Sequence, residues 1–218
     1  MKKDDFNTHI IEVLKERLPS ARKKLANYRR TDFSEVYFFF DFDGHAKNLP
    51  FNIDNIETLK EMLNVFNNET EFGKLYISYP MIEAYRDLKD GNCQSFRNDC
   101  YVYKENFKSY KKDTANNIYT NINKLDYPMW CEIISNYINR IACLFTIKEL
   151  DRNKFINEIT SHTIFNKEKE LFTKKGLVFV ISALPQFLID YSKAFWDASL
   201  KKRKKPNLVT KCQKKIHW

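Results

Sequence analysis

The stretch Val36-Tyr37-Phe38-Phe39-Phe40-Asp41-Phe42-Asp43-Gly44 decides the fold class. Its first five residues are apolar and β-favouring with no polar alternation, which is typical of a strand covered on both faces, as in a parallel sheet. Asp41 and Asp43 stand at i and i+2, so their side chains point to one face of an ideal strand. We expect a buried strand that ends in an acidic pair, at the edge where α/β folds bind ligands.

The segments around this strand predict a strand–helix–strand–helix unit over residues 36–88. A helix is expected from Asp54, where an acidic capping residue precedes apolar positions spaced three or four apart. A second short strand covers residues 74–78, and Pro80 then suits the first position of a helix over 81–88. Two strands joined through a helix are expected to be parallel, with a right-handed connection.

The rest of the chain is mostly helical in pattern. Residues 6–28 form an amphipathic stripe that Pro19 interrupts, which predicts either one kinked helix or two shorter ones. The polar, Tyr-rich stretch 89–123 is predicted to be an irregular insertion with one helix. Further helices are expected over 129–150, 152–173 and 185–196, with a third strand over 177–181. We therefore divide the chain into an N-terminal helix (1–30), an α/β domain with a helical extension (31–200) and a basic flexible tail (201–218).

Composition agrees with a packed α/β protein. Of 218 residues, 43% are hydrophobic and 15% aromatic, enough for a core, and the four glycines favour helices over turn-rich β folds. The net charge of +9 comes from the tail, because the other 200 residues hold 29 basic and 28 acidic side chains. The tail is either a phosphate-binding segment or a solvated end. Its basic residues are Lys201, Lys202, Arg203, Lys204, Lys205, Lys211, Lys214 and Lys215, and the first five are the candidate contacts to DNA or RNA.

The cysteines and the apolar segments suggest a cytoplasmic protein. Five irregularly spaced cysteines include no CxxC pair, and no histidine stands near them at the spacing of a zinc site. An odd number of cysteines and a charged N-terminus predict reduced thiols in the cytoplasm. The longest apolar run, residues 176–189, is too short to cross a bilayer, so no membrane association is expected.

Asp41 and Asp43 form a candidate cation-binding site. Two adjacent carboxylates repel each other, and hard oxygen ligands suit Mg²⁺ or Mn²⁺. Because parallel strands end at the same edge, Glu83 in the first turn of the next helix is a candidate third ligand beside Asp41 and Asp43. The alternatives are structural: Asp43-Gly44 is also ordinary turn chemistry, and Glu83 also complements a helix dipole.

Two further residues are candidates for a catalytic role. Ser78 ends the second strand, where its hydroxyl could cap the following helix or orient a water molecule. His45 directly follows the acidic pair and could polarise a phosphate or shuttle a proton, or it could be a solvated turn residue.

Residues 37–43, followed by Ser78, Pro80 and Glu83, resemble the Toprim-related proteins of bacterial phage defence, of the RloB-like and abortive-infection type. In that family a hydrophobic strand ends in Asp-x-Asp, and a later strand runs into Ser-Asn-Pro-x-Phe-Glu. Here Tyr79 and Ile82 replace the Asn and the Phe, while the spacing of Ser, Pro and Glu is kept. The resemblance covers about a quarter of the chain, residues 35–88.

This resemblance implies a small, mainly parallel Toprim-like sheet and a Mg²⁺-dependent hydrolase of the nuclease type or a phosphotransferase-like protein, often beside an ATPase partner subunit. Asp41 and Asp43 would hold the metal ion. Toprim domains also carry a glutamate on an earlier strand, whereas Glu12 and Glu16 fall here in a helical pattern. Either the general acid or base comes from elsewhere, or the domain is degenerate and acts as a partner.

The same strand also resembles the first motif of haloacid-dehalogenase-type phosphatases, with Asp41 as nucleophile, Asp43 as general acid and Ser78 as the second-strand hydroxyl. The expected Thr is replaced by His45, and no later Lys and Gly-Asp motif is clear after Gly176.

The three hypotheses, a metal nuclease, an inactive interaction subunit and a phosphatase, predict different geometries around these acids. A metal nuclease requires the acids to converge on a cation-sized gap, and an inactive interaction subunit pairs them with Lys or Arg. A phosphatase places a Lys near Asp41 in an enclosed pocket.

Overall fold

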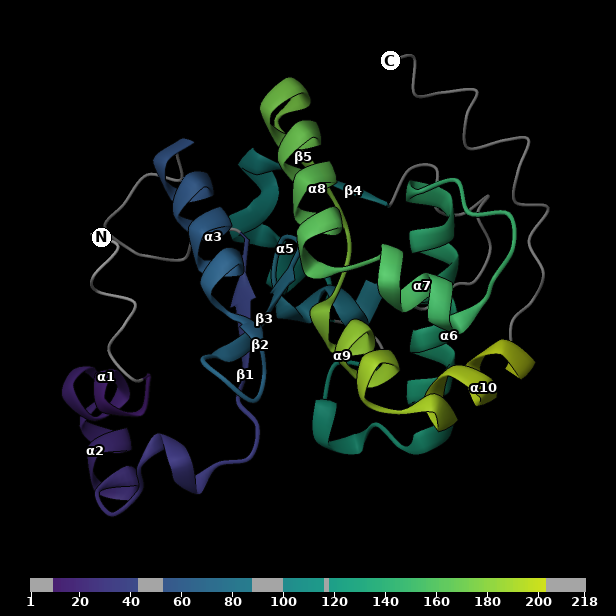
Figure 1. Cartoon of the computed structure of the whole chain (residues 1–218). Helices are drawn as coiled ribbons and strands as arrows, with labels where there is room; N and C mark the ends of the chain where they lie inside the picture. The colour runs from purple at the N-terminus through teal and green to yellow at the C-terminus, as the bar shows by residue number, and fades with distance from the viewer. Residues whose placement is uncertain (1–9, 43–52, 88–99, 116–117, 203–218) are drawn as a thin grey trace. The chain divides into compact units, whose positions relative to one another are not determined.

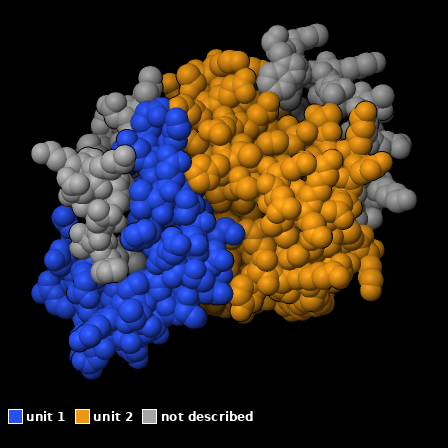
Figure 2. Space-filling model, viewed as in Figure 1, with its two compact units in different colours: residues 1–38, 51–75 blue, residues 39–50, 76–218 orange. Residues whose placement is uncertain are grey.

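The computed structural model describes residues 10–42, 53–87, 100–115 and 118–202. The predicted site residues Asp43 and His45, and Arg203, Lys204 and Lys205 of the tail, lie outside these ranges. The chain divides into two compact units: Met1–Phe38 with Phe51–Leu75, and Phe39–Pro50 with Tyr76–Trp218 (Figure 2).

Unit 1 begins with two short helices, because Pro19 starts a new helix and cannot continue the first one. The prediction of two shorter helices is therefore confirmed. In the 3₁₀ helix that follows, the side chain of Arg30 donates to the carbonyls of Glu69 and Glu71. The elements are α1 (Ile10–Arg17), α2 (Pro19–Leu25), η2 (Arg30–Asp32), the start of β1 (Tyr37–Asp41), α3 (Ile53–Val65), β2 (Asn67–Asn68) and the start of β3 (Gly73–Ser78).

The strands form a small mixed sheet in the order β1-β3-β2. β1 and β3 are parallel, as predicted, because Lys74 donates to the Val36 carbonyl at one end and Phe42 to the Ser78 carbonyl at the other. β2 is antiparallel to β3, with Asn68 opposite Gly73. The expectation of a mainly parallel sheet is therefore not confirmed, because the segment after α3 turns back as a short hairpin strand.

The burial of the two parallel strands differs from the expectation. β3 is buried along nearly its whole length. In β1, Phe39 stacks on Tyr76 and meets Phe187 edge-on. Phe42, which follows the strand, is fully buried. The other residues of β1 are half-buried and Phe40 is 40% exposed, so the prediction of a buried strand covered on both faces is wrong.

Unit 2 is mostly helical and packs around α6 (Tyr127–Leu144), which contacts α9 and α10 (Figure 1). The predicted apolar stripe of this helix is confirmed, and residues such as Ile134 and Ile138 are fully buried. The other elements are η3 (Ile82–Asp87), β4 (Tyr101–Tyr103), η4 (Lys104–Asn106), α5 (Phe107–Asp113), η5 (Ile122–Lys124), α7 (Arg152–Glu158), α8 (Ser161–Lys175), β5 (Leu177–Phe179), α9 (Ala183–Tyr191) and α10 (Lys193–Lys202).

The third predicted strand is present as β5, but it belongs to a different sheet. β5 pairs antiparallel with β4 in a two-stranded sheet, with Tyr101 opposite Phe179. Just beyond β3, Tyr79 forms an antiparallel bridge with Ile181, which follows β5. α8 lies along β5 and ends at Gly176, whose left-handed backbone turns the chain into the strand.

Cys100 and Cys131 carry free thiols, and both are buried. Cys143 is disulfide-bonded, so the expectation of reduced thiols throughout the chain is wrong at this residue. Within the described ranges, every helix is too short or too polar to cross a bilayer.

Candidate functional site

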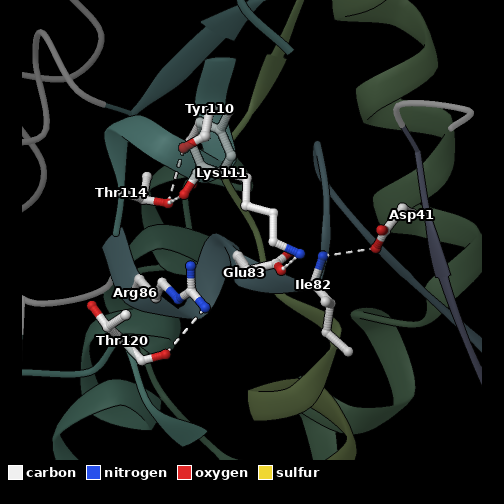
Figure 3. A network of polar contacts seen from close by, with 8 residues as sticks. All are labelled: Asp41, Ile82, Glu83, Arg86, Tyr110, Lys111, Thr114 and Thr120. Carbon is white, nitrogen blue, oxygen red and sulfur yellow. Dashed lines mark hydrogen bonds and ion pairs between the residues drawn. The ribbon is translucent and has the colours of Figure 1, made fainter. Parts of the chain in front are cut away.

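Asp41 at the end of β1 lies beside the first residue of η3 (Figure 3). Its Oδ1 accepts a hydrogen bond from the backbone N–H of Ile82 at 2.7 Å. This contact arises because β1 and β3 are parallel, so that the chain leaving β3 enters η3 at the same edge where β1 ends. The structure thus brings Asp41 to the residue that precedes Glu83.

Glu83 stands in the first turn of η3 and is 8% exposed. Its Oε1 lies 2.6 Å from Nζ of Lys111 on α5, whose side chain is 65% exposed. Burial acts to raise the pKa of Glu83. The hydrogen bond and charge of Lys111, a backbone hydrogen bond and the charge of Arg86 together outweigh burial and lower the pKa below its ordinary value. Glu83 is therefore an ionised, largely enclosed carboxylate near neutral pH.

Side chains from several elements hold η3 in place. At its start, the Ile82 N–H is bound by Asp41, and the Ile82 carbonyl accepts from the Ser182 hydroxyl at 3.3 Å. Farther along, Arg86 donates to the Thr120 carbonyl at 3.1 Å. Because a 3₁₀ helix has poor internal hydrogen-bond geometry, these outside partners fix the position of Glu83.

The end of η3 is held by a buried polar network at Asp87. The Tyr110 hydroxyl donates to Oδ2 of Asp87 at 2.5 Å, and Arg140 donates to the Asp87 carbonyl at 2.8 Å. A second nitrogen of Arg140 donates to the Val180 carbonyl, also at 2.8 Å. Burial, with the charge and hydrogen bond of Asp87, raises the pKa of Tyr110 well above its ordinary value, so this hydroxyl keeps its proton.

Sequence reasoning missed Lys111 and Arg140. Lys111 lies in a polar stretch with many lysines, and nothing in the local pattern distinguishes it. Arg140 did leave a signal, because it stands with Asn136 and Asn139 within the strongest apolar helix, and all three are buried. A charged residue in such a helix indicates a buried partner.

Ser78 has a structural contact. It is fully buried, and its Oγ accepts a hydrogen bond at 3.1 Å from the N–H of Ala183, the first residue of α9. Ser78 thus caps a helix from a distant part of the chain, not the helix that follows it. An enclosed hydroxyl already engaged with the backbone gives no support to its role in the phosphatase hypothesis.

The described acids do not by themselves complete a metal centre. Asp41 and Glu83 are brought to one edge, but within the described ranges no three His, Cys, Asp or Glu side chains are grouped as metal ligands. The predicted nucleic-acid contacts Lys201 and Lys202 are exposed at the end of α10, and Lys202 donates to the Pro128 carbonyl.

In comparisons with known proteins, the chain matches no family model, no curated protein and no solved structure. The function is therefore argued from the geometry around Asp41 and Glu83.

Proposed function

We propose that the chain is a divalent-metal-dependent nuclease or related phosphotransferase of Toprim-like type, acting in abortive-infection defence against phage. The observation that carries the proposal is the hydrogen bond from Ile82 to Asp41, which places the strand-end carboxylate beside the residue that precedes Glu83. A cytoplasmic setting and an ATPase partner belong to the same proposal. The sequence resemblance at Ser78, Pro80 and Glu83 supports it.

The electrostatics of Glu83 suit a cation ligand. Its lowered pKa keeps it ionised near neutral pH, and the contacts that hold η3 fix its position. A metal ion would therefore bind a carboxylate that is already charged and oriented. Lys111 now supplies the positive charge from a mostly exposed side chain. Because the Lys111 ammonium is mostly exposed, water can solvate it once a doubly charged ion displaces it from Glu83.

The residues have distinct parts in this function. Asp41 and Glu83 would hold Mg²⁺ or Mn²⁺, together with Asp43. The metal ion, when bound, supplies the charge that stabilises the attacked phosphate and lowers the pKa of a bound water. Lys111, once released from Glu83, offers a cation to a phosphate oxygen beside the site.

Calorimetric titration with Mg²⁺ and Mn²⁺ tests this proposal. The wild type should bind, and both Asp41→Asn and Glu83→Gln should weaken binding by at least tenfold, because each removes a charged ligand. Glu170→Gln is the matched control, since Glu170 is also paired with a lysine, Lys174 at 2.8 Å, but lies on the surface of α8. Equal weakening in the control, or unchanged binding in both site variants, would contradict the assignment.

An inactive interaction subunit is the second candidate, and the ion pair between Glu83 and Lys111 is the observation that favours it. The missing Toprim glutamate points the same way, because Glu12 and Glu16 lie on helix α1, where Glu12 pairs with Lys15. If the folded wild type binds neither Mg²⁺ nor Mn²⁺, this second function replaces the first. Co-purification of a tagged chain from its native cells would then identify the partner.

A further inference from the structure

Helix α5, which supplies Lys111, carries a basic face. Lys108, Lys111 and Lys112 are spaced at i, i+3 and i+4, so they share one side of the helix, and all three are exposed. The adjoining side is anchored, because Phe107 and Tyr110 are buried. The lysines are therefore presented outward from a fixed helix.

The basic face continues onto the end of α8. The backbone N–H of Lys104 donates to the Gly176 carbonyl at 2.9 Å, and the side chain of Lys104 passes over Gly176, where an added Cβ would lie 3.8 Å from Cδ of Lys104. Lys175 precedes that glycine and is exposed. We call Lys104, Lys108, Lys111, Lys112 and Lys175 the basic face.

Most of this charge is not neutralised by neighbours. Within the described ranges, Lys111 is the one member of the basic face that forms an ion pair, and its partner is Glu83. Acidic side chains nearby in sequence are Glu105 and Asp113. The basic face therefore adjoins the candidate site, because Lys111 belongs to this face and pairs with Glu83.

We propose that the basic face binds the phosphate backbone of a single-stranded nucleic acid and leads it to Glu83. Clustered lysines bind such a strand by releasing its counterions. Tyr103 precedes Lys104 and is 50% exposed, so its ring is available for base stacking, which a single strand allows and a duplex does not. Delivery to Glu83 rests on the proposed function, whereas the binding itself does not.

The test is fluorescence anisotropy of a labelled 20-nucleotide single strand, as DNA and as RNA, in EDTA. The double variant Lys108→Gln/Lys112→Gln should bind the strand about tenfold more weakly. The slope of log K against log salt concentration should also be shallower by about 1.4, because two phosphate contacts are lost. Tyr103→Ser should weaken binding of the single strand by about fivefold or more. Glu83→Gln should strengthen binding, because it removes a negative charge and frees Lys111.

Lys23→Gln/Lys24→Gln is the matched control, because it removes the same charge from exposed positions on α2. Equal loss in this control, or loss only when Lys201, Lys202, Arg203, Lys204 and Lys205 are all changed to Gln, overturns the proposal. Binding of a duplex as tightly as the single strand overturns the choice of partner. EDTA separates this test from the metal titration: retained strand binding without metal binding overturns the proposed function alone.

Discussion

Asp41 has two roles at the residue scale, as a candidate metal ligand and as the acceptor for the Ile82 N–H. Asp41→Asn should keep that acceptor and unfold at the same denaturant concentration as the wild type, while metal binding is lost. Asp41→Ala removes the acceptor as well and should lower the free energy of unfolding by about 1 kcal/mol. Urea denaturation alongside metal titration checks both. A strongly destabilised Asp41→Asn would show that the charge of Asp41, and not only its acceptor oxygen, stabilises the fold.

Glu168 on α8 is a buried acid outside the candidate site. It is fully buried, its Oε2 accepts from the Phe179 N–H at 2.9 Å, and its Oε1 has no hydrogen-bond partner within the described ranges. Burial raises the pKa of this carboxyl well above its ordinary value, and the hydrogen bond only partly opposes the shift. Burial of Glu168 therefore favours its neutral form in the folded protein.

The stability of the protein should depend on pH through Glu168. As pH rises above the unfolded pKa of about 4.3, the unfolded chain releases this proton and the folded chain keeps it, so stability falls until pH passes the folded pKa. Glu168→Gln mimics the neutral acid and should remove this fall. Thermal unfolding should be followed from pH 5 to pH 8. For each pH unit, the folding equilibrium constant of the variant should rise relative to that of the wild type by up to about tenfold. Parallel curves would indicate an ordinary pKa.

At the scale of elements, η3 depends on an arginine that α6 supplies from the core. Arg140→Met should remove the donor to the carbonyls of Asp87 and Val180 and lower the free energy of unfolding by about 3 kcal/mol. Arg22→Met is a matched control, because Arg22 also donates to two carbonyls, those of Lys15 and Glu16, but is exposed. Chemical denaturation should show a small change in the control, and equal losses would mean that burial of Arg140 is unimportant.

At the scale of the whole molecule, two strands run without a break from unit 1 into unit 2, since β1 crosses after Phe38 and β3 after Leu75. We therefore expect both units to unfold in one transition. Gly73 offers a test from within unit 1. It has φ +117°, and a Cβ there would collide with the ring of Phe38.

Gly73→Ala should lower the melting temperature reported by tryptophan fluorescence, although all three tryptophans belong to unit 2. Circular dichroism, which reports both units, should show the same lowered midpoint. Gly176→Ala is the control, because φ is also positive there but the added Cβ meets only ordinary contacts, so its shift should be smaller. Two separate transitions in Gly73→Ala would show that the units unfold independently.

The sequence determined the parts of this protein that depend on neighbouring residues. The apolar run before Asp41 predicted β1, the apolar spacing from Ile133 to Ile141 predicted α6, and Pro19 predicted a break between two helices. Strand propensity, helical periodicity and the missing N–H of proline act over a few residues, so they are visible in the chain itself. The proximity of Asp41 to η3 followed from the same kind of rule, because parallel strands end at one edge.

Only the tertiary structure decided which distant residues meet. Lys111 pairs with Glu83 from 28 positions away, Arg140 binds the Asp87 carbonyl across 53, and β5 pairs with β4 and not with β3. No local pattern encodes these contacts, because each depends on how whole elements pack after the core forms. Packing also left Phe40 partly exposed and buried a charged arginine, and so decided which polar groups surround the candidate site.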